Sequence, residues 1–155
     1  IRLSPLYSAV LARVEAEQGP IDWVLPAVAQ HRDLVASEVA TWPVKPRIVE
    51  GEAGKLAAFR SARAALACSG TVTLELAVAG VPQVVAYRTG WLEAQIARRL
   101  ITAETAVLAN LVIGEKVVPE FLQEYGTVEA VSKALAAVIT EGPERQRQVE
   151  AFARL

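Results

Sequence analysis

The chain has 155 residues, a length typical of one globular domain that can bury a hydrophobic core without disulfides or structural metals. Hydrophobic residues make up 53% of it, aromatic residues 6% and charged residues 21%, with a formal net charge of −1. This composition argues against a disordered chain, a coiled coil and a nucleic-acid partner, which would require more positive charge. One cysteine and one histidine exclude a disulfide framework and leave no clustered zinc site, so we expect a reducing compartment and no cofactor.

The sequence predicts neither a membrane span nor a complete translated product. The longest apolar stretch, 76–87, contains Gly80, Pro82 and Gln83, and it falls short of the roughly 18 residues that a spanning helix needs. The chain begins with Ile1 and contains no methionine. We therefore expect it to be part of a longer protein.

Helical and strand patterns alternate along the chain, which is typical of an α/β fold with a parallel sheet and helices on its faces. Ser4 and Pro5 begin the first helix, and Gly19 with Pro20 ends it. We expect one central Rossmann-like sheet of about five or six strands. The elements predicted next are strands at 21–25, 47–50, 64–68 and 83–87, and helices at 26–39, 54–62 and 71–79.

The last third of the chain is predicted to be irregular and then helical. A helix at 90–101 precedes an irregular stretch at 102–119 and a short helical turn near Phe121. Two further helices are expected at 128–140 and 143–154.

These two terminal helices define the predicted domain organisation, a Rossmann-like lobe at 1–126 followed by a helical tail at 127–155. Each carries an apolar stripe that needs a partner surface. We expect the tail to pack poorly on its own lobe, or to dock on another copy of the chain in a homodimer.

The sequence Ser69-Gly70-Thr71 follows a predicted buried strand and begins a helix. In an open parallel sheet, ligands bind outside the carboxyl ends of the strands, where helix N-termini present N–H groups and a positive dipole end. Gly70 would let the backbone approach an anion, and the two hydroxyls would add donors, so the pattern predicts a phosphate site. The alternative is that Ser69 or Thr71 merely caps the helix.

Two charged residues near this turn each allow two interpretations. Glu75 could reach a sugar hydroxyl beside a bound phosphate, or it could complement the helix dipole. Arg88 follows the strand at 83–87 and could face a phosphate, or it could be a solvated arginine at a strand end.

Five short motifs occur in order over most of the chain. They are Ser69-Gly-Thr-Val-Thr-Leu-Glu75, Ala79-Gly-Val-Pro82, Val84-Val-Ala-Tyr-Arg88, Leu108-Ala-Asn110-Leu and Val118-Pro-Glu-Phe-Leu-Gln123. Together they resemble the carboxyl-terminal half of the lipid-A-disaccharide synthase family. The first two are shared broadly by glycosyltransferases with two Rossmann-like lobes, and the later ones are more discriminating. The family has Pro-Asn-Leu where this chain has Ala109-Asn110-Leu111.

The resemblance implies an inverting transfer of 2,3-diacylglucosamine from its UDP-activated form to 2,3-diacylglucosamine 1-phosphate, with release of UDP. It places Ser69, Gly70 and Thr71 at the diphosphate and Glu75 at the ribose hydroxyls. With Arg88 added, the expected UDP-sugar-binding residues are Ser69, Gly70, Thr71, Glu75, Arg88, Asn110, Glu120 and Gln123.

The resemblance also implies that the catalytic residues lie elsewhere. The family's Gly-Ser-Arg phosphate loop would precede Ile1, and the aspartate proposed as general base belongs to the amino-terminal lobe. We therefore expect no catalytic residue here, and a cytoplasmic enzyme at the periphery of the inner membrane whose terminal helices can be exchanged between two subunits.

Other readings stay open on the residues alone. Another UDP-sugar transferase or epimerase of the same architecture, or a non-catalytic nucleotide-binding or interface module, would show the same early motifs. Cys68 is expected to be a small buried core residue. A set of aromatic and basic residues could contact a membrane surface, or it could belong to an amphipathic core stripe; its members are Tyr87, Arg88, Trp91, Arg98 and Arg99.

Overall fold

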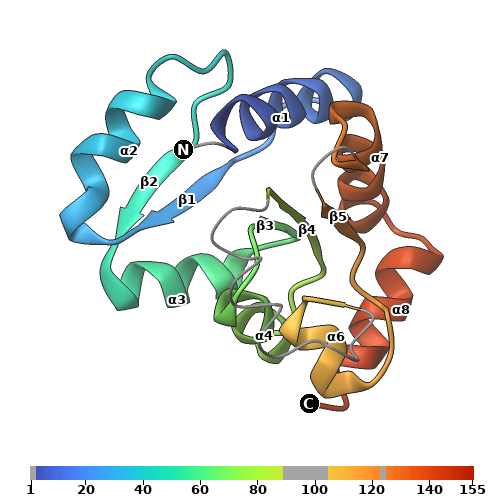
Figure 1. The fold of residues 1–155 in the computed structure, drawn as a ribbon. Coiled ribbons are helices and arrows are strands. Elements are labelled where there is room, and N and C mark those ends of the chain that lie inside the picture. Colours follow the sequence, from blue (N-terminus) through green and yellow to red (C-terminus); the bar gives the residue numbers. More distant parts are fainter. Residues whose placement is uncertain (1–2, 89–104, 123–124) are drawn as a thin grey trace. The chain divides into compact units, whose positions relative to one another are not determined.

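The structure, a computed structural model, describes residues 3–88, 105–122 and 125–155. The chain divides into two compact units, Ile1–Ala62 and Arg63–Leu155 (Figure 1). Each unit contains parallel strands flanked by helices, which confirms the predicted α/β class. The helix expected at 90–101 lies outside the described residues.

The first unit contains a two-stranded parallel sheet. Its strands pair in register from Val24 opposite Arg47 to Ala27 opposite Glu50. The elements are α1 (Ser4–Gln18), β1 (Val24–Ala27), the 3₁₀ helix η1 (Ala29–His31), α2 (Arg32–Val39), β2 (Arg47–Glu50) and α3 (Gly51–Ser61).

Three features show how the elements of the first unit are built and joined. Pro26 was expected to begin a helix but lies within β1, where a two-stranded sheet leaves one edge of the strand without a ladder partner and so tolerates proline. α3 crosses β2 closely at Gly54, because a Cβ there would lie 3.4 Å from the Cβ of Val49. Trp42 Nε1 donates to Ser4 Oγ at 3.0 Å and thereby joins the end of α2 to the start of α1.

The second unit contains a three-stranded parallel sheet in the order β3-β4-β5. The middle strand is buried along its whole length, as expected for a strand covered on both faces. The elements are β3 (Ala65–Ala67), α4 (Thr71–Val78), β4 (Gln83–Tyr87), α6 (Leu108–Ile113), β5 (Glu120–Leu122), α7 (Val128–Ile139) and α8 (Pro143–Phe152).

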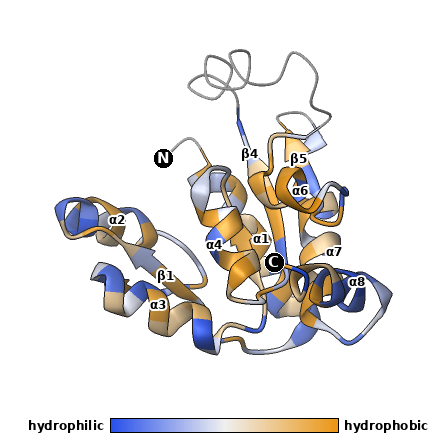
Figure 2. Cartoon of the chain, turned by 90° about the horizontal axis from the view of Figure 1, so that it is seen from below, coloured by the Kyte–Doolittle hydropathy of each residue, from blue (hydrophilic) through white to orange (hydrophobic). Residues whose placement is uncertain are grey.

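Helices cover both faces of this sheet. α7 packs on β4 from one side, with Val131, Leu135 and Val138 buried, and each such side chain contributes roughly 1.5–3 kcal/mol. α4 contacts β3 and β4 and also packs on α6. Figure 2 shows hydrophobic residues along α4, β4 and α7, whereas α8 is largely hydrophilic. The core of this unit therefore lies between α7, the sheet and α4.

The terminal helices pack on their own unit, contrary to the expectation that they would pack poorly there. α8 buries Ala151 and Phe152, and its polar Gln148 is only 1% exposed. The expectation was wrong because α8 turns Gln148, Ala151 and Phe152 toward its own unit, whereas the apolar Val149 and Leu155 are exposed. The buried face of α8 includes the polar residue Gln148, which the spacing of apolar residues does not predict.

Three other expectations are corrected. The described strands form two parallel sheets and not one, because alternating strands and helices fix parallel pairing but not whether successive units share a sheet. The predicted irregular stretch contains α6. The residues around Phe121 form β5 and not a helical turn, since the Val85 N–H bonds to the Pro119 carbonyl at 2.9 Å and draws this segment into the sheet.

Candidate functional site

The turn between β3 and α4 places a helix N-terminus at the carboxyl edge of the sheet. Gly70 is the N-cap residue, with φ of 106°, a left-handed backbone region that favours glycine. The N-cap position of α4 is therefore occupied by a residue without a side chain, and not by Ser69 or Thr71 as in the alternative interpretation. Thr73 instead donates to the Gly70 carbonyl through its N–H at 3.2 Å and its hydroxyl at 2.9 Å.

Glu75 lies on α4 one turn beyond this N-terminus, and it is exposed. Residues four apart share a helix face, so Glu75 lies on the same side of α4 as Thr71. The first turn of α4 contains no acidic residue, and the helix dipole acts mainly within that turn. Glu75 therefore lies beyond the turn in which the helix dipole acts most strongly.

Of two further residues expected to bind the donor, the structure describes Arg88 but not Gln123. Arg88 directly follows β4 and is exposed at the same carboxyl edge as the β3–α4 turn. Gln123 lies outside the described residues, as do Trp91, Arg98 and Arg99 of the aromatic and basic set.

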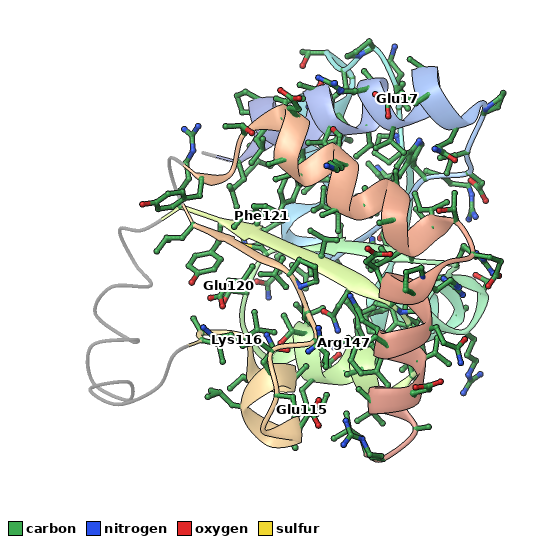
Figure 3. The ribbon with its side chains drawn as sticks, turned by 90° about the vertical axis from the view of Figure 1, so that its right-hand side faces the viewer. Glu17, Glu115, Lys116, Glu120, Phe121 and Arg147 are labelled. Atoms are coloured by element: carbon green, nitrogen blue, oxygen red, sulfur yellow. The ribbon has the colours of Figure 1, made fainter. Side chains whose placement is uncertain are left out.

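Glu120, the first residue of β5, bonds to two other segments. Its Oε1 accepts from the Tyr87 hydroxyl at 2.6 Å and from the Ala106 N–H at 3.0 Å, and its Oε2 accepts from the Thr105 hydroxyl at 2.7 Å. Figure 3 shows Glu120 and Phe121 on opposite sides of β5. Burial, reinforced by the hydrogen bond and the negative charge of Glu120, raises the pKa of Tyr87 well above its usual range. Tyr87 therefore stays protonated and donates to Glu120.

Asn110, on α6, is 2% exposed and makes four side-chain hydrogen bonds. Its Nδ2 donates to Thr105 Oγ1 at 3.3 Å and to the Val118 carbonyl at 3.0 Å. Its Oδ1 accepts from the N–H groups of Val117 at 3.0 Å and Val118 at 2.9 Å. An amide offers two donors and two acceptor lone pairs, so this side chain is fully used within the protein.

Thr105 joins Glu120 and Asn110, and reasoning from the sequence missed it. Its Oγ1 donates to Glu120 and accepts from Asn110 and from the Val107 N–H at 3.2 Å. The bond from the Val107 N–H to the Thr105 hydroxyl is local, because it spans two residues, and threonine commonly forms such bonds in turns before a helix. The bonds to Glu120 and Asn110 come from tertiary structure.

The β3–α4 turn and Tyr87 lie at the carboxyl ends of neighbouring parallel strands, whereas Glu120 is the first residue of β5 and Asn110 bonds to residues 117–118 before it. Ala67, the last residue of β3, pairs with Val85, two residues before the end of β4 at Tyr87. Helix α4 follows the turn, and it packs on α6, the helix that carries Asn110. Cys68 lies between the turn and β3 and is exposed, which corrects the expectation of a buried core residue, because β3 ends at Ala67.

The arrangement suits an anionic ligand with hydroxyl groups. A helix N-terminus, two hydroxyl side chains and a glycine offer donors to a phosphate, and Glu75 offers acceptors to a sugar. Among the described residues, no three His, Cys, Asp or Glu side chains are grouped so that they could hold a metal ion. Within the same residues, no helix has the length and apolar character needed to span a bilayer.

Nearly the whole of this chain is similar to known proteins. Residues 9–154 match the family model described as lipid-A-disaccharide synthetase. A lipid-A-disaccharide synthase of Bradyrhizobium diazoefficiens is 55% identical over 150 residues, which are 97% of this chain and 38% of that protein. Those of Nitrobacter hamburgensis and Ruegeria pomeroyi are 53% identical over 150 residues and 43% identical over 145 residues. The chain thus spans about 38% of the length of the first two relatives, and with a family model that matches nearly all of it, it belongs to the lipid-A-disaccharide synthase family.

Proposed function

We propose that this chain forms the UDP-sugar-binding part, the carboxyl-terminal lobe, of a lipid-A-disaccharide synthase. In this proposal it holds UDP-2,3-diacylglucosamine while the sugar is transferred to 2,3-diacylglucosamine 1-phosphate and UDP is released. The observation that carries the proposal is the β3–α4 turn, where Gly70, with φ of 106°, is the N-cap of α4 and the helix begins at the carboxyl edge of a parallel sheet.

The proposed contacts follow from the positions of the side chains. Ser69, Gly70 and Thr71 would bind the diphosphate, because they surround the N-terminus of α4. Glu75 would accept hydrogen bonds from the ribose hydroxyls, since a carboxylate one turn along the helix points back toward its start. Arg88 would face a phosphate from the end of β4. Gln123 is retained in the donor site from the family resemblance alone.

No group in the chain is assigned to catalysis or to a cofactor. Inversion at the sugar needs a base to deprotonate the acceptor hydroxyl, and we propose that this base comes from the remainder of such an enzyme. The division into a lobe at 1–126 and a tail at 127–155, the cytoplasmic location and contact with the inner membrane surface are likewise proposals. A homodimer through the terminal helices would have to use exposed residues such as Val149, because Phe152 is buried in its own unit.

The activity can be tested in a chimera with the Bradyrhizobium diazoefficiens relative. This chain replaces the matching segment of that protein, and formation of disaccharide and UDP is measured with the acylated substrates. We expect the chimera to form both products, because the donor contacts lie in the exchanged segment and the base in the retained one. A folded chimera that binds UDP but forms no disaccharide would instead support a non-catalytic nucleotide-binding module.

The role of Glu75 can be measured on the chain itself by calorimetric titration with UDP. We expect Glu75→Ala to weaken binding by about 1–3 kcal/mol, the range for lost hydrogen bonds to a charged group. Glu129→Ala is the matched control, because Glu129 is an exposed acid in the first turn of α7, where only the helix dipole is affected. Equal UDP affinity in wild type and Glu75→Ala, with both folded, would remove Glu75 from the site.

A further inference from the structure

A continuous hydrogen-bonded chain joins three segments of the second unit. The Tyr87 hydroxyl at the end of β4 donates to Glu120 at 2.6 Å, and the Thr105 hydroxyl before α6 donates to the other oxygen of the same carboxylate at 2.7 Å. Glu120 also accepts the Ala106 N–H at 3.0 Å. One carboxylate on β5 thereby fixes both the end of β4 and the segment that leads into α6.

This network holds a segment that has no regular secondary structure of its own. Residues 105–107 precede α6, and Thr105 and Val107 are buried. The polar groups of this segment are satisfied through Thr105 Oγ1 and Glu120, because the Val107 N–H bonds to the former and the Ala106 N–H to the latter. Hydrogen bonds to a carboxylate are about twice as strong as neutral ones, so Glu120 dominates the position of this segment.

The segment is connected to the proposed nucleotide site through Tyr87 and through α6. Tyr87 ends β4, the strand paired with β3, which leads into the β3–α4 turn, and α6 packs on α4, whose N-terminus is the proposed diphosphate site. A shift of residues 105–107 would therefore move α6 against α4 and change the geometry of the β3–α4 turn. Positions of binding groups must hold within a fraction of an ångström for full affinity.

We propose that Thr105 is a positioning residue for the nucleotide-sugar site, and that it acts through Glu120 and Tyr87 to fix the segment that leads into α6. This inference rests on the proposed function of that site. It changes the roles expected for Asn110 and Glu120. Asn110 has no hydrogen-bonding group left for a ligand, and Glu120 accepts three hydrogen bonds from the protein, so in this proposal both residues hold the segment.

The test replaces Thr105 in the full chain and measures UDP binding by calorimetry at a temperature where all variants are folded by circular dichroism. Thr105→Val keeps the shape and removes the hydroxyl, and we expect it to weaken UDP binding about tenfold. Thr105→Ser restores the hydroxyl and is expected to bind within about twofold of wild type. Tyr87→Phe removes one bond at the far end of the network and should weaken binding by about threefold.

Thr127→Val separates positioning from general destabilisation. Thr127 Oγ1 accepts the Ala130 N–H at 3.1 Å and caps α7, so this variant makes the same substitution and lowers stability through a lost cap. We expect its UDP affinity to equal that of wild type. If Thr105→Val binds UDP as tightly as wild type, or if Thr127→Val loses as much affinity as Thr105→Val, the positioning role is wrong while the proposed function stands. If the wild-type chain does not bind UDP, the proposed function fails and this inference fails with it.

Discussion

Replacing Gln148 with leucine is expected to lower the free energy of unfolding by about 2–5 kcal/mol, although Gln148 belongs to a largely hydrophilic helix. Gln148 Oε1 accepts the Gln83 N–H at 2.8 Å, and Nε2 donates to the Gln83 carbonyl at 2.9 Å. Both residues are buried. Leucine would leave two backbone groups without partners in the interior, each at a cost of about 1–3 kcal/mol.

The reason for this pair lies in the length of β5. Val85 is the first residue of β4 that pairs with β5, so Gln83 lies before the point where β5 begins. The backbone of Gln83 faces the same side as that of Val85, since alternate residues of a strand bond to the same neighbour. The side-chain amide of Gln148 therefore takes the place that a longer β5 would fill.

Gln146→Leu is the matched control for this prediction. Gln146 lies in the same helix and is exposed, with its Nε2 bonded to Glu150 at 2.7 Å. Surface substitutions of this kind change stability by about 0.5 kcal/mol or less. Urea unfolding followed by circular dichroism gives both values, and equal free energies of unfolding for the two leucine variants would contradict the proposed role of Gln148.

Asn110→Ala is expected to cost about 3–5 kcal/mol, because one truncation removes four buried hydrogen bonds. The N–H and the carbonyl of Val118 would lose the partner that Asn110 provides, whereas the Val117 N–H keeps its bond to the Glu115 carbonyl at 3.0 Å, and no water has ready access at a site that is 2% exposed. Urea unfolding measures the loss. Hydrogen exchange should also become faster at the Val118 amide, which bonds to Asn110 Oδ1, and less so at the Val117 amide, which keeps the Glu115 carbonyl.

Leu111→Ala provides the comparison within the same helix. Leu111 is 39% exposed and follows Asn110 directly, so its truncation is expected to cost about 1 kcal/mol or less. If Asn110→Ala were no more destabilising than Leu111→Ala, the amide would not be holding the segment at 117–118. Its side chain would then be available to the nucleotide-sugar donor, as the family resemblance first implied.

The sequence predicted those elements whose signals are local. The strands at 47–50 and 83–87 have the bounds that were expected, and α7 and α8 begin at the expected positions, where Thr127 caps α7 and Pro143 lies in the first turn of α8. A threonine cap and a proline in the first turn act on the backbone next to them, so no distant partner is needed to recognise them. The turn at Gly70 belongs to the same class, because a glycine between a strand and a helix fixes the backbone locally.

Tertiary structure decided the features that depend on contacts between distant residues. β5 is a strand because Val85 pairs with it, and Gln148 is buried because β5 begins too late to satisfy Gln83. The network of Thr105, Glu120 and Asn110 exists because three segments converge, while each residue alone is an ordinary polar side chain. The sequence therefore determined the α/β class, the β3–α4 turn and the family resemblance, whereas packing decided the number of sheets and which polar side chains serve the fold, since these depend on which buried groups find partners.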